Sequence, residues 1–261
     1  MIVAFPLLFG ALAEKFSARP VLAACLVAAV SACAAPPPPA TPHDPDEAKN
    51  RDVHAFNLAL DKALVRPTAN AYGSILPAPV QEGVANFAEN LDLPGDVANG
   101  ILQARPHFAL QNTTRFLLNT TLGIGGLFDP AGALGLHAKK TDFGETLHVW
   151  GVGEGAYMEL PGLGPSTGRD TMGTIVDIVL NPVSKLVPAP ESHVATVAKV
   201  GSKLGDRDRY SETLDSVLYD SADSYAQARL LYLQNRRFEL GQTAAGGEDA
   251  FLDPYEDPYG Q

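Results

Sequence analysis

The chain has 261 residues, of which 46% are hydrophobic and 19% are charged, with a net charge of −11 and two cysteines. This length suits one sizeable domain. The acidic balance argues against nucleic acid as a partner and against electrostatic attraction to anionic lipid, so any contact with lipid has to be apolar.

The first 32 residues have the pattern of a secretory signal peptide. An apolar run over residues 1–13 is followed by Lys15 and Arg19 and then by a second apolar run over 21–30. Neither run reaches the roughly 18–20 residues that span a bilayer. A basic flank, a short apolar stretch and small residues before a cleavage point predict a signal peptide that is removed.

The signal peptide ends in the bacterial lipobox pattern V-S-A-C, residues 30–33. This pattern predicts cleavage before Cys33 and a covalent lipid on Cys33. Residues 22–25 also fit the pattern, but cleavage before Cys25 would leave an apolar stretch too short for a signal peptide, so Cys33 is favoured. The four prolines at 36–39 make residues 33–43 an extended spacer behind this anchor.

Helical spacing of apolar residues follows the spacer. It predicts one helix over 44–64, which Arg66-Pro67 should stop, and a second helix from Pro79, which Leu93-Pro94-Gly95 should end. A third helix is expected over 108–122.

Residues 113–136 form an apolar stretch that contains five glycines and, beyond Arg115, a single charge at Asp129. We predict a helical hairpin in which Gly123, Gly125 and Gly126 form the turn. Asp129 should be the N-cap of the next short helix, with Pro130 at its first position. These residues alone leave open a buried hairpin in a soluble protein or a hairpin inserted into lipid. A helix over 108–122 would be about 22 Å long, enough for one leaflet but too short to cross a bilayer.

Asp142 and Glu145 have the spacing of a capping box, and a glycine-rich connection over 151–168 follows it. Further helices are predicted over 172–179, 191–200, 206–218 and 223–240. Residues 241–261 are acidic, lack any basic residue and are expected to be disordered. The sequence therefore predicts a mainly α protein with a single helical domain over 44–240.

Few sequence motifs suggest a catalytic, metal-binding or phosphate-binding site. Residues 164–168, GPSTG, match the G-x-S-x-G pattern around Ser166, but nearby prolines disfavour the required strand, and His193 would be its base only by coincidence of folding. The six histidines lack metal-site spacing, so no metal is expected. The glycines at 123–126 lack the lysine of a phosphate-binding loop.

Several motifs in collinear order resemble the signature of the MlaA (VacJ) lipoprotein family. The match covers roughly residues 44–240, and its departures are local, at His148 and over 155–159. The matching segments are NTTLGIGGLFD at 119–129, Asn50-Arg51, Phe56-Asn57, Arg66-Pro67, Asn86-Phe87, Asn90-Leu91, TRF at 114–116, DFG at 142–144, WGVG at 150–153, and GPST at 164–167 with Arg169-Asp170.

The resemblance implies a ring-like helical protein embedded in one leaflet of the outer membrane, on its periplasmic side, with an amphipathic channel. Such a protein removes mislocalised phospholipids from the outer leaflet, associates with a trimeric porin and passes lipid to a periplasmic MlaC-like carrier. It implies no enzyme activity and no cofactor beyond the lipid on Cys33. Two alternatives remain: a structural lipoprotein that accompanies a porin without moving lipid, and a serine hydrolase that uses Ser166.

Overall fold

The computed structural model describes residues 42–180 and 191–242. The predicted signal peptide, Cys33 and nearly all of the spacer and acidic tail lie outside the described residues. The elements in chain order are α2 (Glu47–Leu60), η1 (Asp61–Val65), α3 (Arg66–Ile75), α4 (Ala78–Leu102), α5 (Pro106–Thr121), α6 (Pro130–Ala133), α7 (Phe143–Val149), β1 (Tyr157–Leu160), β2 (Gly164–Thr167), α8 (Gly168–Leu180), α10 (Glu191–Arg209), α11 (Ser211–Leu218) and α12 (Ser224–Glu239).

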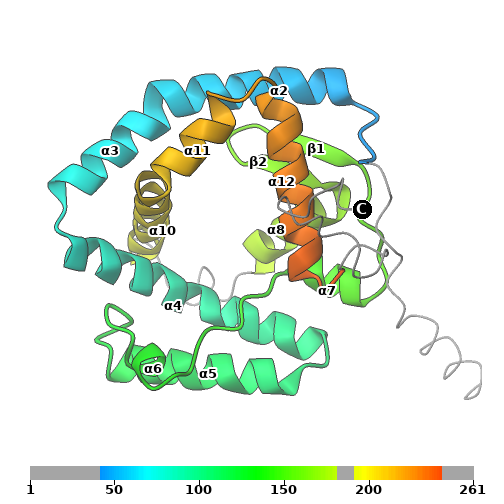
Figure 1. Cartoon of the computed structure of the whole chain (residues 1–261). Helices are drawn as coiled ribbons and strands as arrows, with labels where there is room; N and C mark the ends of the chain where they lie inside the picture. The colour runs from blue at the N-terminus through cyan, green and yellow to red at the C-terminus, as the bar shows by residue number, and fades with distance from the viewer. Residues whose placement is uncertain (1–41, 181–190, 243–261) are drawn as a thin grey trace, which may run out of the picture.

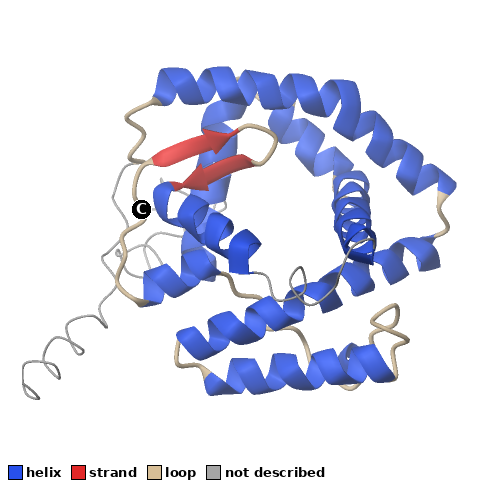
Figure 2. Ribbon diagram, turned by 180° about the vertical axis from the view of Figure 1, so that it is seen from behind, coloured by secondary structure: helices blue, strands red, loops and turns tan. Residues whose placement is uncertain are grey.

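The helices form a ring. This confirms the prediction of a mainly α, single-domain, ring-like fold. In Figure 1, α2, α3 and α4 follow one another around the outside, and α12 stands on the side opposite α3. Helix α10 lies inside this frame beside α3 and α4, and α5 packs along the outer side of α4. The view from behind shows the same ring, with the two strands next to α8 (Figure 2).

The first helix does not stop at Arg66-Pro67, so that prediction is wrong. A π-helical turn, η1, joins α2 to α3, and the Arg66 amide bonds to the Asp61 carbonyl, five residues earlier. Pro67 lies just after this π-helical turn, and the irregular hydrogen bonding of the turn accommodates a residue without an N–H. The continuous helix therefore forms one long side of the ring.

The prediction that Leu93-Pro94-Gly95 ends the second helix is also wrong, because α4 continues through Pro94 to Leu102. Leu93 is fully buried, and α4 packs on both α5 and α10. Tertiary packing of this kind outweighs the local cost of a proline inside a helix. Gly100 allows the close approach to α5, since a Cβ on it would lie 3.2 Å from the Ala109 nitrogen.

The glycine-rich connection contains an antiparallel strand pair that the sequence did not predict. Tyr157 pairs with Thr167, and Leu160 pairs with Gly164. A two-stranded sheet leaves one edge of each strand free, which accommodates Pro165. The helix predicted over 191–200 instead runs to Arg209, and Gly201 brings it within reach of Tyr72 on α3.

The apolar core is small. It consists of Tyr157, Tyr225 and Leu233 with the partly buried Tyr232 beside them. Six of the ten buried apolar residues in the described part of the chain are alanines, whereas seventeen polar or charged residues are buried there. Twenty-seven large hydrophobic side chains are exposed among the same residues, which inverts the usual distribution of a soluble domain.

Candidate functional site

Three polar side chains form a buried stripe along α5. Asn112, Arg115 and Asn119 are at most 3% exposed and recur at helical spacing. Asn112 pairs with both backbone groups of Lys139, donating at 2.8 Å and accepting at 2.9 Å. Arg115 donates to the Leu136 carbonyl. The stripe thus holds the segment that returns from the hairpin against α5.

The opposite face of this hairpin is apolar and exposed. Leu110 and Leu117 on α5 are 70% and 56% exposed, and Ile124 and Phe128 beyond its end are 67% and 60% exposed. The hydroxyls of Thr113, Thr114 and Thr121 each donate to the carbonyl four residues earlier in α5; for Thr121 the acceptor is Leu117, at 2.6 Å. We call this exposed surface of α5 and its turn the apolar rim.

The glycines of the turn differ in what they provide. Gly125 and Gly126 have φ of +72° and +100°, which favours glycine. A Cβ on Gly126 would lie 2.6 Å from Asn90, and one on Gly123 would lie 2.4 Å from the Asn119 and Phe128 carbonyl oxygens. The turn therefore combines left-handed backbone with close packing against α4.

Asp129 is the N-cap of α6 and accepts from the Gly132 amide at 2.9 Å, with Pro130 at the start of the helix. Burial disfavours the charged carboxylate, but bonds from Gly132 and Asn119 and the nearby Arg115 outweigh burial and lower the pKa of Asp129. This one carboxylate connects the turn, α5 and α6.

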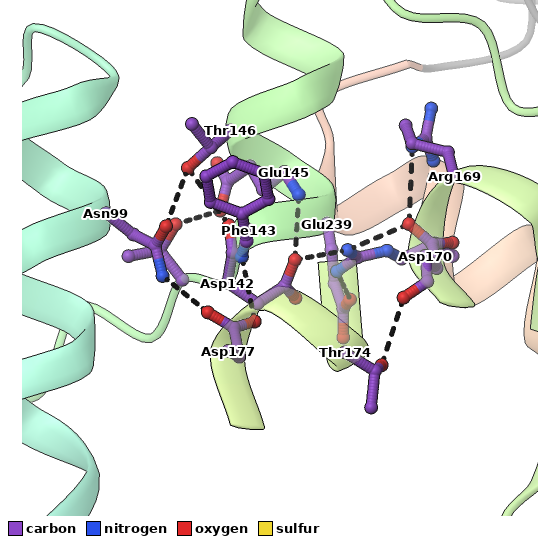
Figure 3. A network of polar contacts seen from close by, with 12 residues as sticks. Asn99, Asp142, Phe143, Glu145, Thr146, Arg169, Asp170, Thr174, Asp177 and Glu239 are labelled. Atoms are coloured by element: carbon purple, nitrogen blue, oxygen red, sulfur yellow. Dashed lines mark hydrogen bonds and ion pairs between the residues drawn. The ribbon is translucent and has the colours of Figure 1, made fainter. Parts of the chain in front are cut away.

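A charged cluster joins α7, α8 and α12 (Figure 3). Arg236 of α12 donates to Asp142 at 2.7 Å and to Asp170 at 3.1 Å. Asp142 also caps α7 by accepting from the Glu145 amide at 2.7 Å. Burial raises the pKa of Asp170, but Arg236 and Arg169 outweigh it, and the net pKa is lowered. We call this set of residues the charged corner.

Asp177 attaches α4 to the charged corner. Its carboxylate accepts from Asn99 of α4 at 3.1 Å and from the Phe143 amide of α7 at 2.9 Å (Figure 3). Gly144 and Gly173 let α7 and α8 cross closely, since a Cβ on Gly173 would lie 2.3 Å from the Gly144 nitrogen. These contacts close the ring on the side of α12.

A second ionic contact joins η1 to α10 and α11. Arg207 binds both oxygens of Asp61, at 3.0 and 2.8 Å, and donates to Asp215 at 2.7 Å. Tyr219 donates to Asp61 at 2.7 Å. The π-helical turn therefore places Asp61 where it fixes α10 inside the ring.

A cavity of about 1030 Å³ lies between α4, α8, α10 and residues 140–142. Its lining carries seven acidic and four basic residues beside apolar ones that include alanines, Leu91 and Ile178. Asp96 on α4 lines it, is 8% exposed and accepts from the Thr141 amide at 3.2 Å. Burial, together with repulsion from Asp92 and Glu89, raises the pKa of Asp96 to about 7. The cavity lining thus carries charged groups, whereas the apolar rim does not.

Ser166 does not have the surroundings of a nucleophile. It lies in β2 and α8 follows it directly, so a strand does lead into a helix here, but the side chain is buried, 6% exposed. Its hydroxyl is within 2.9 Å of the Thr171 hydroxyl, while His193 is exposed on α10. No group of three metal-ligating side chains occurs within 42–180 and 191–242.

The described helices include none that is both long and apolar enough to cross a membrane. Fold and site together define the class: a helical ring protein that exposes an apolar rim, is bonded through buried polar groups, and carries charged groups in its cavity.

Comparison with known proteins places the chain within this class. Residues 42–239 match the family model described as MlaA lipoprotein. The intermembrane phospholipid transport system lipoproteins MlaA of Shigella flexneri and Escherichia coli are 38% and 37% identical, each over 84% of both chains. An uncharacterized protein of Rickettsia bellii is 37% identical over 74% of this chain and 75% of its own.

A solved structure described as the structural basis for maintenance of bacterial outer membrane lipid asymmetry is similar as well. It is 33% identical, with a TM-score of 0.64, and the match covers 76% of this chain and 98% of that one. The chain belongs to the MlaA lipoprotein family.

Proposed function

We propose that this protein provides a path by which misplaced phospholipids leave the outer leaflet of the outer membrane toward the periplasm. The observation that carries the proposal is the combination of an exposed apolar rim on α5 and its turn with a cavity whose lining carries charged groups. A rim of this kind can contact lipid tails while a charged interior accepts headgroups, which lowers the cost of moving a headgroup past hydrocarbon. The names of the MlaA relatives, which refer to intermembrane phospholipid transport, support this function.

The ring would lie in the periplasmic leaflet, held by a lipid on Cys33. Helix α5 has 16 residues, about 24 Å at 1.5 Å per residue, so it can enter one leaflet without crossing the bilayer. The apolar rim would add to the membrane affinity that this lipid supplies. Replacing Cys33 with Ala should release the protein from the outer membrane, whereas Cys25→Ala should not.

The path would be passive: Ser166 contacts Thr171 and not a histidine, and the described residues hold no group of metal ligands. Direction would then come from an acceptor, a periplasmic MlaC-like carrier, that removes lipid at the open end of the ring. A trimeric porin would be the neighbour in the membrane. A porin-bound scaffold without transport, or a hydrolase at Ser166, predicts different results in the following experiment.

The experiment complements a deletion strain with cavity variants. Deletion should expose phospholipid at the cell surface and sensitise cells to detergent and chelators. Ser202 lines the cavity, so Ser202→Trp should fail to restore the barrier although the protein is anchored normally. Ser216→Trp, the same change at an exposed site on α11, should restore it.

Ser166→Ala should also restore the barrier, because the hydroxyl contacts Thr171 and not a histidine. Restoration by Ser202→Trp would favour the scaffold. A stable, anchored and inactive Ser166→Ala protein would favour the hydrolase.

A further inference from the structure

The charges in the cavity are unevenly distributed. Helix α4 contributes acidic residues at Glu82, Glu89, Asp92 and Asp96 and no basic residue. The basic residues of the lining, by contrast, come from α10 and from Lys140. The cavity thus has an acidic wall on α4 and cations beside it on α10, where α10 packs against α4 (Figure 1).

The cations nearest the acidic wall already have partners. Lys199 of α10 pairs with Asp92, and Lys140 pairs with Glu89 at 3.4 Å. Among the described residues, no cation pairs with Asp96. Its carboxylate accepts a single hydrogen bond, from the Thr141 amide to Oδ1. Oδ2 is left without a hydrogen-bond donor among these residues although the side chain is more than nine-tenths buried.

Such a carboxylate is costly in a protein unless a cation completes its surroundings. The buried aspartates of the charged corner show the contrast, since Asp170 has both Arg236 and Tyr232 as donors.

We propose that the cavity binds the headgroup of an aminophospholipid, with its ammonium at Asp96. A zwitterionic headgroup of the phosphatidylethanolamine type supplies the cation that Asp96 lacks. An anionic headgroup such as that of phosphatidylglycerol supplies no cation to Asp96 and meets a lining with more acidic than basic residues. This inference rests on the proposed function, because it assumes that phospholipid enters the cavity.

The test presents the full-length protein, reconstituted in a bilayer, with phosphatidylethanolamine and phosphatidylglycerol that carry the same photoactivatable acyl chain. We expect capture of phosphatidylethanolamine to exceed that of phosphatidylglycerol about tenfold, the ratio expected from one partly screened ion pair. Asp96→Asn should bring the ratio close to one. The variant should fold, since its side-chain oxygen can still accept from Thr141 while the buried charge is gone.

The matched control is Asp52→Asn, the same change at an exposed position of α2 outside the cavity lining, which should keep the wild-type ratio. Circular dichroism checks that both variants fold. Equal capture of the two lipids by the wild type, or an unchanged ratio in Asp96→Asn, would overturn the headgroup preference and leave the path itself intact. Capture of neither lipid by the wild type would overturn the proposed function as well.

Discussion

The α5 hairpin and the charged corner bury polar groups in different ways. In the hairpin, amides such as Asn112 and Asn119 bond to backbone groups and to Asp129, and the other face is left apolar and exposed. In the corner, Arg236 lies between two carboxylates and is enclosed by protein. The ring therefore takes its shape from directional polar bonds, and many of its large apolar side chains remain exposed.

This difference has an energetic consequence. A neutral hydrogen bond contributes about 1 kcal/mol net, whereas a buried charge that loses its partner costs about 3–5 kcal/mol. The corner should thus be the less tolerant of the two regions. Apart from the buried Arg115 and its ion pair with Asp129, the hairpin should be sensitive mainly where backbone geometry or close contact demands a particular residue.

The largest effect is expected at the charged corner. Arg236→Met should lower the free energy of unfolding by about 3–5 kcal/mol, because it leaves Asp142 and Asp170 without their shared partner. Chemical denaturation in detergent micelles measures the loss. Arg51→Met is the control: Arg51 forms an ion pair with Asp223 on the surface and should matter far less. Equal losses in both variants would show that the corner does not hold the ring together.

A smaller effect is expected at the hairpin turn. Gly126→Val should cost about 1–3 kcal/mol, since a side chain there requires a φ near +100° and clashes with Asn90. Gly95→Ala, inside α4 with no atom near its Cβ, should leave stability unchanged or raise it by up to about 1 kcal/mol. Thermal unfolding followed by circular dichroism compares the two. A Gly126→Val protein as stable as Gly95→Ala would contradict a tight turn.

Local signals in the sequence predicted the N-caps correctly. Asp129 before Pro130, and Asp142 three residues before Glu145, are recognisable because capping depends on neighbours in sequence. The helical spacing around these caps also gave the mainly α class.

Features that depend on distant partners were missed. Pro94 lies inside a helix because α5 and α10 pack against α4, and Pro67 is accommodated by a π-helical turn whose Asp61 binds Arg207. The buried stripe could have been recognised from Asn112, Arg115 and Asn119, which recur at spacings of three and four in an apolar segment. That Asp96 lacks an ion-pair partner could not have been recognised from the sequence, because it depends on the folded pairs of Lys140 with Glu89 and of Lys199 with Asp92.

The central claim is that the rim faces lipid and the cavity faces water. Spin labels on Leu117→Cys at the rim and on Ser202→Cys in the cavity test it most directly, using protein reconstituted in a bilayer. The account predicts that the label at 117 collides mainly with oxygen dissolved in the lipid, and the label at 202 mainly with a water-soluble nickel chelate. A label at 117 as accessible to the chelate as the one at 202 would contradict the account.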